Sequence, residues 1–319
     1  GGEARSAIMA ASGCGGKGLS IVILTRGSGL GALILGSALS AGAACPPAGL
    51  DKAALEAMKK TEWRVSGDAR RHALAVELLD CLASPDPALR DALAFDALSH
   101  WLRGQLIVPA TLQTMRASLV AQLRPAAADA AGFRQPFAAL ALAEVARVDR
   151  LQPFLSPAER AELVDAAIGY LRGVRDYRGF DTREGWRHGV AHGADLLLQL
   201  GLNPALDAGQ LKAILAAIAP QVAPPGEHFY VYGEGERLMA PVFYIGRRSV
   251  FSGDEWSTWL AGLAASRPKA EPATAVSLAA RHNLSQFLLS LYASLRESGT
   301  PEMQAGMLPG VTAALKTLD

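Results

Sequence analysis

The chain has 319 residues, of which 50% are hydrophobic and 19% are charged, so it can bury a large core and is neither disordered nor fibrous. Its 31 Lys and Arg residues almost balance its 30 Asp and Glu residues, and the net charge of +1 gives no electrostatic reason to expect nucleic acid as a partner. Aromatic residues make up only 6%, so Ala and Leu must fill most of the interior, and both favour helix. We therefore expect an all-α protein.

The N-terminal segment has the order of a secretory signal peptide. Arg26 precedes an apolar run from Gly29 to Leu39, and the small residues 41–43 follow it. The run of about 11 residues is well short of the ~20 that cross a bilayer, so we expect no transmembrane span. We expect residues 1–43 to be a leader and signal peptide, removed or disordered, and the protein to be exported, either periplasmic or secreted. A buried N-terminal helix is the alternative.

The three cysteines, Cys14, Cys45 and Cys81, have neither a CxxC pair nor zinc-ligand spacing. Cys45 follows small residues, so a lipid anchor at Cys45 is a second alternative, although Gly42 stands where lipoprotein signals place an aliphatic residue. In an oxidising compartment Cys45 and Cys81 could pair. Because Cys81 lies within an apolar stretch, we expect a plain buried thiol rather than a bridge.

From Leu50 onward the sequence predicts a succession of amphipathic helices and almost no strand. The expected helices cover residues 51–62, 68–83, 87–103, 109–123, 134–148, 157–172, 184–200, 207–219, 234–247, 254–266, 273–296 and 301–318. Capping boxes at Ser156 and Ser252 mark two helix starts. Gly104 and Gly201 are placed where a helix ends on a left-handed residue.

Helix pairs recur along the chain. The second helix of each pair begins near Pro87, Pro136, Arg187 and Glu236, a period of about 50 residues that is close to the ~40 to 47 of HEAT-type repeats. We therefore expect residues 44–319 to form a single α-helical repeat domain, a HEAT-like α-α superhelix with a concave surface.

The segment from Gly185 to Leu197 is the most informative for chemistry. His188, His192 and Asp195 are spaced i, i+4 and i+7, which predicts that they share one helix face. Two His residues at this spacing can chelate one zinc ion, but no Glu stands between them as general base. A further ligand would have to come from other segments, and the candidates are Glu234, Glu236, His228 and His282. We expect no cofactor, with zinc at His188 and His192 as the alternative.

Charged residues on neighbouring inner helices are expected to partner this face. Arg237 lies one repeat after Asp195, and Glu144 is an acid in an otherwise apolar run on the preceding inner helix. Buried charges persist when they are paired, so we expect Glu144, Asp195 and Arg237 to form one cluster with the histidines. If the Asp195–Arg237 pair is buried, removing either partner should cost about 3 to 5 kcal/mol.

Two functions remain open at this point. The first is a binding or scaffolding solenoid, because helical repeats present extended surfaces and the chain has no complete catalytic motif. Its candidate binding residues are Glu144, Trp186, His188, His192, Asp195, Glu236 and Arg237. The second is a hydrolase-type enzyme, possibly metal-dependent, whose candidate catalytic residues are His188, His192, Asp195 and Arg237. The expected partner is a protein or a small-molecule ligand, whose identity the sequence leaves open.

One resemblance bears on these expectations. The segments 137–144, 170–180, 185–197 and 236–238 together resemble the bacterial domain of unknown function family 2785, over roughly residues 90–248. The resemblance implies an α-helical repeat fold and brings no established activity.

Overall fold

The structure is a computed structural model that describes residues 45–125, 129–267 and 272–318. The described residues belong to one compact unit. The predicted leader and signal peptide, and Cys14, lie outside the described residues.

The described chain is almost entirely helical, as expected for an all-α protein, and all twelve predicted segments contain helix. The α-helices are α1 (Lys52–Lys60), α2 (Asp68–Glu77), α3 (Asp96–Arg103), α4 (Pro109–Leu123), α5 (Arg134–Leu151), α6 (Pro157–Gly173), α7 (Gly189–Gly201), α8 (Ala208–Val222), α9 (Glu234–Gly246), α10 (Gly253–Ser266), α11 (Ala275–Ser298) and α12 (Pro301–Lys316). Both predicted capping boxes, at Ser156 and Ser252, are present.

Two helices near the start of the described chain are broken where continuous α-helix was predicted. Residues Leu78–Ala83 form a 3₁₀ helix, η1, after α2, and residues Ala88–Phe95 form a π-helix, η2, before α3. A tightened 3₁₀ turn is common at a helix end, and η1 stops because Ser84, which precedes Pro85, is held extended at φ −61° and ψ 135°.

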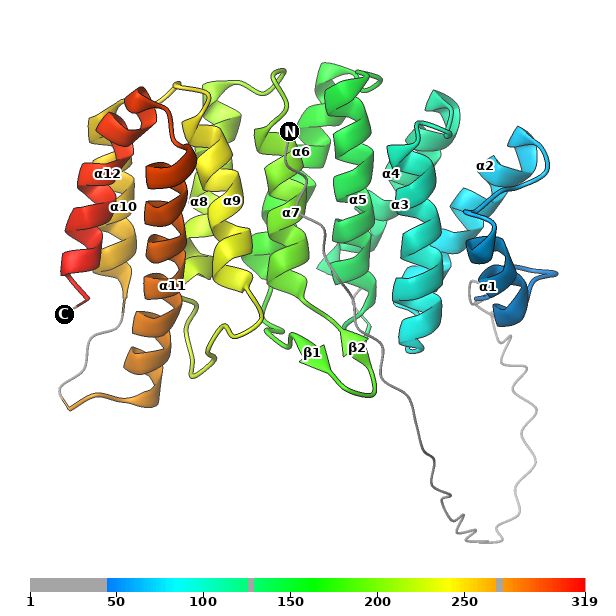
Figure 1. Ribbon diagram of the computed structural model, residues 1–319, viewed down its shortest axis with the longest axis horizontal. Helices are drawn as coiled ribbons and strands as arrows, with labels where there is room; N and C mark the ends of the chain where they lie inside the picture. The colour runs from blue at the N-terminus through cyan, green and yellow to red at the C-terminus, as the bar shows by residue number, and fades with distance from the viewer. Residues whose placement is uncertain (1–44, 126–128, 268–271, 319) are drawn as a thin grey trace, which may run out of the picture. The chain divides into compact units, whose positions relative to one another are not determined.

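The helices form two layers (Figure 1). Helices α3, α5, α7, α9 and α11 follow one another in the front layer, and α4, α6, α8 and α10 lie behind them. The front helices α5, α7, α9 and α11 all begin at the lower edge in this view. Helix α5 is central, and the buried alanines that recur between Ala138 and Ala146 let α7 approach it closely.

A β-hairpin replaces the predicted start of the helix at Glu184. Strand β1 (Phe180–Asp181) pairs antiparallel with β2 (Gly185–Trp186), and α7 begins only at Gly189. The Asp181 Oδ1 atom accepts hydrogen bonds from the backbone N–H groups of Arg183 and Glu184, which closes the turn. Gly185 has φ +74°, a left-handed conformation that a helix cannot contain.

The prediction that two helices end on left-handed glycines is also wrong. Gly104 ends α3 in a right-handed conformation, and the left-handed residue is Gln105 at φ +57°. Gly201 is still helical and lies against Ile245, where a Cβ would be 3.1 Å from Ile245 Cγ1. Gly201 therefore serves the close packing of α7 on α9 rather than a turn.

Cys45 and Cys81 form a disulfide, which corrects the expectation of a free buried thiol. Burial of Cys81 does not prevent pairing, because Cys45 packs against the same core and the two Cα atoms lie 5.0 Å apart. A sulfur in a disulfide cannot also carry a thioether-linked lipid, so this bond and a lipid anchor at Cys45 exclude each other.

No membrane-spanning candidate is present among the described helices, since none is both long enough and apolar enough to cross a bilayer.

Candidate functional site

Polar side chains line the seam where α7 packs against α9. From the N-terminal ends of the two helices inward, the seam carries His188, Glu234, His192, Asp195 and Arg237. His188 is the residue just before α7, in a left-handed conformation at φ +54° rather than within the helix, and its ring lies 5.8 Å from that of His192. Its backbone N–H donates to the Arg178 carbonyl oxygen, which fixes this bend to the base of the hairpin. The hairpin therefore determines where the His188 imidazole points.

His188 faces the first residue of α9. The Nε2 atom of His188 lies 3.7 Å from Oε1 of Glu234, and neither atom has a hydrogen-bond partner. Both residues are buried, with 8% of His188 and 2% of Glu234 exposed. The other carboxylate oxygen of Glu234 accepts the backbone N–H of Tyr232 at 2.9 Å.

The two facing atoms are both hydrogen-bond acceptors. Burial, and secondarily the charge of Arg237, lower the pKa of His188 to about 4, so its ring is neutral near pH 7. The Tyr232 backbone beside the ring favours its protonated form, and because Nε2 is unpartnered we assign the ring proton to Nδ1. A neutral imidazole that donates from Nδ1 presents a lone pair at Nε2, which here faces the Glu234 carboxylate.

His192 lies deeper in the seam and has a structural role. Its Nδ1 atom is 3.2 Å from the Pro136 carbonyl oxygen, and its ring packs edge-on against Phe137 of α5. Burial holds the pKa of His192 well below its usual value, with smaller contributions from His188 and Arg237. A neutral His192 thus acts as a polar tie between α5 and α7.

The predicted ion pair between Asp195 and Arg237 is confirmed. Both guanidinium nitrogens Nε and Nη2 of Arg237 bond to the two carboxylate oxygens of Asp195, which makes the pair bidentate. Burial raises the pKa of Asp195, and the charge of Arg237 opposes that rise. The pair is only partly buried, because 42% of the Arg237 side chain and 18% of the Asp195 side chain are exposed.

Glu144 lies near this pair but has a different partner. Its Oε1 atom accepts two hydrogen bonds from Arg103 of α3, whereas the sequence predicted that Glu144 would cluster with Asp195 and Arg237. The charge of Glu144 still acts on Asp195, whose pKa it raises. The second carboxylate oxygen of Glu144 is buried without a hydrogen bond.

Aromatic rings cover the outer end of the seam. Trp186 stacks on His188 with 4.7 Å between the ring centroids, and Tyr232 meets Trp186 edge-on at 5.7 Å. Phe180 packs on Trp186, and the hydroxyl of Tyr232 donates to the Phe180 carbonyl oxygen at 3.3 Å. The Tyr232 ring lies so close to the Cα of Gly179 that a Cβ there would overlap it. Phe180 and Tyr232 are 43% and 41% exposed, so this cover faces solvent.

Sequence reasoning missed two arginines that hold the hairpin in place. Arg90 is fully buried and donates to the carbonyl oxygens of Glu184 and Trp186, which ties η2 to the hairpin. Arg187 donates to the Ala131 carbonyl oxygen, and both guanidinium groups pack on the ring of Phe133. The only local signal for Arg90 was a charge within an apolar run.

Of the four candidate additional metal ligands, Glu234 reaches His188, whereas His228, His282 and Glu236 do not join the two histidines. His228 stacks on Tyr177, and the Nε2 atom of His282 lies 3.1 Å from the Tyr230 carbonyl oxygen. Glu236, which the sequence also indicated as a binding residue, is exposed on α9 and is not one of the seam residues. Across residues 45–125, 129–267 and 272–318, no three His, Cys, Asp or Glu side chains are arranged to hold a metal ion.

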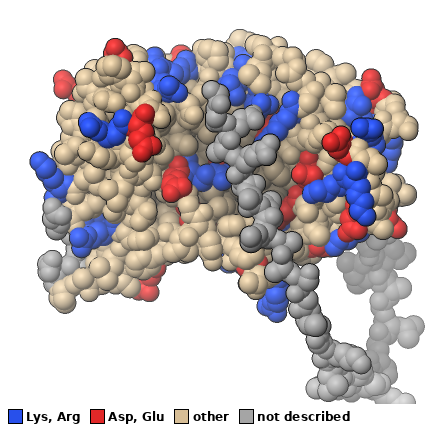
Figure 2. Space-filling view, viewed as in Figure 1, with Lys and Arg blue, Asp and Glu red and all other residues tan. Residues whose placement is uncertain are grey.

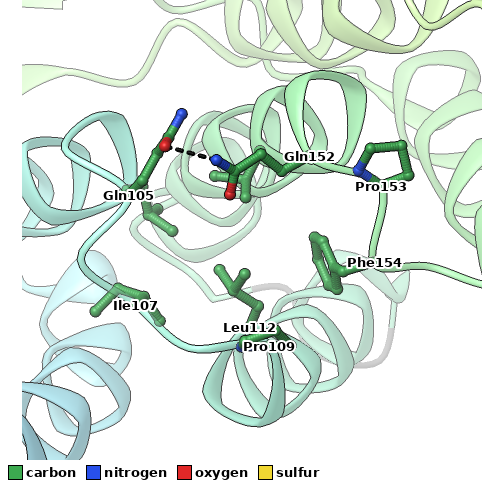
Figure 3. Close-up of a pocket in the computed structure, with 9 residues that line it drawn as sticks. Gln105, Ile107, Pro109, Leu112, Gln152, Pro153 and Phe154 are labelled. Carbon is green, nitrogen blue, oxygen red and sulfur yellow. Dashed lines mark hydrogen bonds between the residues drawn. The ribbon is translucent and has the colours of Figure 1, made fainter.

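A cavity of about 190 Å³ lies at the opposite end of the front helices, where α3 and α5 end (Figure 3). Its walls include Ile107, Leu112 and Phe154, and an amide hydrogen bond of 2.7 Å joins Gln152 to Gln105 beside it. None of its lining residues is titratable, so this cavity offers no acid or base for catalysis. On the face shown in Figure 2, basic and acidic side chains are interspersed rather than gathered by sign.

These features define an all-α protein of two helical layers with a polar seam in its front layer. The chain belongs to the family described as protein of unknown function (DUF2785), whose model matches residues 119–293, more than half of the sequence. The match begins later than the resemblance drawn from sequence and extends further, through α10 and into α11. Neither a curated protein nor a solved structure matches this chain significantly.

Proposed function

We propose that this protein is an exported binding protein, a HEAT-like α-α superhelix over residues 44–319 that binds a ligand or partner at the polar seam of α7 and α9. One observation carries the proposal. Two facing polar atoms of the seam, His188 Nε2 and Glu234 Oε1, are buried without hydrogen bonds. Each such atom costs about 1 to 3 kcal/mol, and native proteins rarely retain two in contact unless something else satisfies them.

The layer order supports the superhelix. Front helices α5, α7 and α9 run parallel, and in the chain each is separated from the next by one helix of the rear layer (Figure 1). Helical repeats stack in this way because a single pair leaves apolar faces uncovered, and repeat proteins use the resulting extended surface for binding.

The disulfide supports export. Disulfides persist in oxidising compartments and are rare in the cytosol, so the Cys45–Cys81 bond agrees with the signal-peptide order of residues 26–43. N-terminal sequencing of the protein from its native host tests this part. A mature chain that begins near Ala44 is expected, and a cytoplasmic chain that retains residues 33–39 would contradict export.

A hydrolase is the second candidate, since His188 Nε2 lies next to the carboxylate of Glu234. A general base works best with a pKa near the working pH, and burial holds the pKa of His188 at about 4. Burial also holds the pKa of His192 well below its usual value, and its ring contacts the Pro136 carbonyl oxygen. A binding role therefore fits the seam better than a hydrolase activity does. Stoichiometric zinc in purified protein, lost in a folded His188→Ala/His192→Ala variant, would favour the enzyme.

Native mass spectrometry tests the binding role directly. Protein exported in its own host should carry a bound molecule that is absent from a Glu234→Gln variant and present in a Glu236→Gln variant. Glu236 is the matched control because it is an exposed acid in the same helical turn. Identical ligand-free spectra for all three proteins, together with no partner that discriminates among them, would argue against the proposal.

A further inference from the structure

We propose that the gap between His188 and Glu234 binds the ammonium group of an organic amine whose apolar part lies against Trp186 and Tyr232. This inference rests on the proposed function and specifies the chemical class of the ligand.

The hydrogen-bonding pattern points to a donor. His188 Nε2 and Glu234 Oε1 are two acceptors 3.7 Å apart, and neither has a partner. An ammonium nitrogen can lie at about 2.8 Å from both atoms and donate one N–H to each. A carboxylate or phosphate ligand would instead add a third acceptor to two that already oppose each other.

The charge balance points to a cation. In the seam, Asp195 is neutralised by the bidentate pair with Arg237, and Glu144 by Arg103. Both histidines are neutral near pH 7, and the Glu234 carboxylate faces one of them rather than a cation. Glu234 is therefore the acid among these seam residues that faces no cation, and it is also the residue with the unpartnered oxygen. A singly charged ammonium group supplies the missing positive charge.

The aromatic cover suggests an apolar body for the ligand. Trp186 stacks on His188, and exposed rings of Phe180 and Tyr232 continue from it to the surface. Aromatic faces next to a carboxylate attract cations and also bury hydrocarbon. Tyr232 is the second-last residue of the segment 223–233, which has no helix or strand, and Gly233 follows it with φ +85°. Entry of a ligand requires the Tyr232 ring to swing outward, since the two acceptor atoms are covered.

The sharpest test replaces the carboxylate by an amide of the same shape. In Glu234→Gln the side chain loses its charge, and its N–H₂ group can donate to His188 Nε2 within the protein. The variant should therefore fold, with the space between residues 188 and 234 already bridged by a hydrogen bond within the protein. Glu236→Gln removes the same charge from the exposed face of the same turn and is the matched control.

Calorimetric titrations with benzylammonium and butylammonium chloride, and with benzyl alcohol as the uncharged counterpart, give the measurement. The wild type and Glu236→Gln should bind the two amines within twofold of each other and bind benzyl alcohol at least tenfold more weakly. Glu234→Gln should lose at least tenfold in amine affinity, because a charge-assisted hydrogen bond is removed. Equal binding of amine and alcohol, or unchanged amine binding by Glu234→Gln, would overturn the proposal.

The two proposals can fail separately. If the amines do not bind but a co-purified molecule is lost in Glu234→Gln, the ligand class is wrong and the binding role of the seam stands. If neither the amines nor any co-purified molecule distinguishes Glu234→Gln from Glu236→Gln, both proposals fail.

Discussion

The Nε2 atom of His188 lies 3.7 Å from Oε1 of Glu234, and no hydrogen bond satisfies either atom. The contact joins the residue before α7 to the first residue of α9, so it forms only when the two helices start side by side. It depends on the left-handed bend at His188, which the hairpin imposes. An unsatisfied pair at the junction of two helices is a cost to stability that ligand binding can offset.

Replacing Glu234 by Gln should raise stability in the absence of ligand. The amide can donate to His188 Nε2 and so satisfies an unpartnered buried atom, and we expect a gain of about 1 kcal/mol. Chemical denaturation of the wild type, Glu234→Gln and Glu236→Gln measures this. The exposed Glu236 position should change by less than about 0.5 kcal/mol. A destabilised Glu234→Gln variant would mean that the carboxylate has a compensating partner in the free protein.

His188 should make the protein less stable in acid. Its pKa is about 4 in the folded protein, against 6.5 for an ordinary histidine, so between these pH values the unfolded chain binds the proton and the folded chain does not. Titration of His188 does not reduce the free energy of unfolding above pH 6.5. As the pH falls toward 4, this free energy decreases by about 3 kcal/mol because of His188.

The measurement compares wild type with His188→Asn in denaturant at pH 7 and at pH 4.5. Asn tolerates the left-handed conformation at φ +54° and does not titrate in this range. The wild type should lose more stability than His188→Asn between the two pH values. Other titrating groups, such as Asp91, whose pKa burial raises to about 6, are shared by both proteins and cancel in the difference. Parallel losses would show that His188 is protonated normally.

The Asp195–Arg237 pair should contribute less than a fully buried pair. Because 42% of the Arg237 side chain is exposed, solvent screens the interaction, and we expect a coupling of about 1 to 2 kcal/mol rather than 3 to 5. A double-mutant cycle with Asp195→Asn and Arg237→Gln gives this value. Additivity within about 0.5 kcal/mol would show that the bidentate geometry is not maintained in solution.

The disulfide should be a major source of stability at the N-terminal end. It joins residues 36 apart in sequence, and restricting a loop of this length in the unfolded chain is worth about 3 to 4 kcal/mol. A Cys45→Ser/Cys81→Ala variant should lose this amount in denaturant unfolding. Wild type treated with a reductant should lose a similar amount, and no change on reduction would indicate that the two thiols are unpaired.

Gly179 should be needed for the position of Tyr232. A Cβ at residue 179 would overlap the Tyr232 ring, so Gly179→Ala should displace that ring and expose Trp186. Acrylamide should then quench the tryptophan fluorescence more strongly than in wild type. Gly169→Ala is the control, because its Cβ meets open space on α6 and should stabilise the helix by up to about 1 kcal/mol without changing quenching.

The sequence alone determined the helical class, the order of the helices and several of their ends. These features depend on interactions within a few residues, such as the capping boxes at Ser156 and Ser252 and the 3.6-residue apolar period. It also predicted the pairing of Asp195 with Arg237, because a regular helix period and a repeat spacing fix the register of neighbouring inner helices.

Tertiary structure decided the rest. The hairpin at residues 180–186 replaced predicted helix because buried Arg90 holds the carbonyl oxygens of Glu184 and Trp186 from a segment more than 90 residues earlier. Glu144 paired with Arg103, a partner that the sequence did not indicate, since α5 contacts α3 on one side and α7 on the other. The His188–Glu234 contact required the hairpin, the bend and both helices at once. Propensity and periodicity report local free energies, whereas these contacts arise only when distant segments meet.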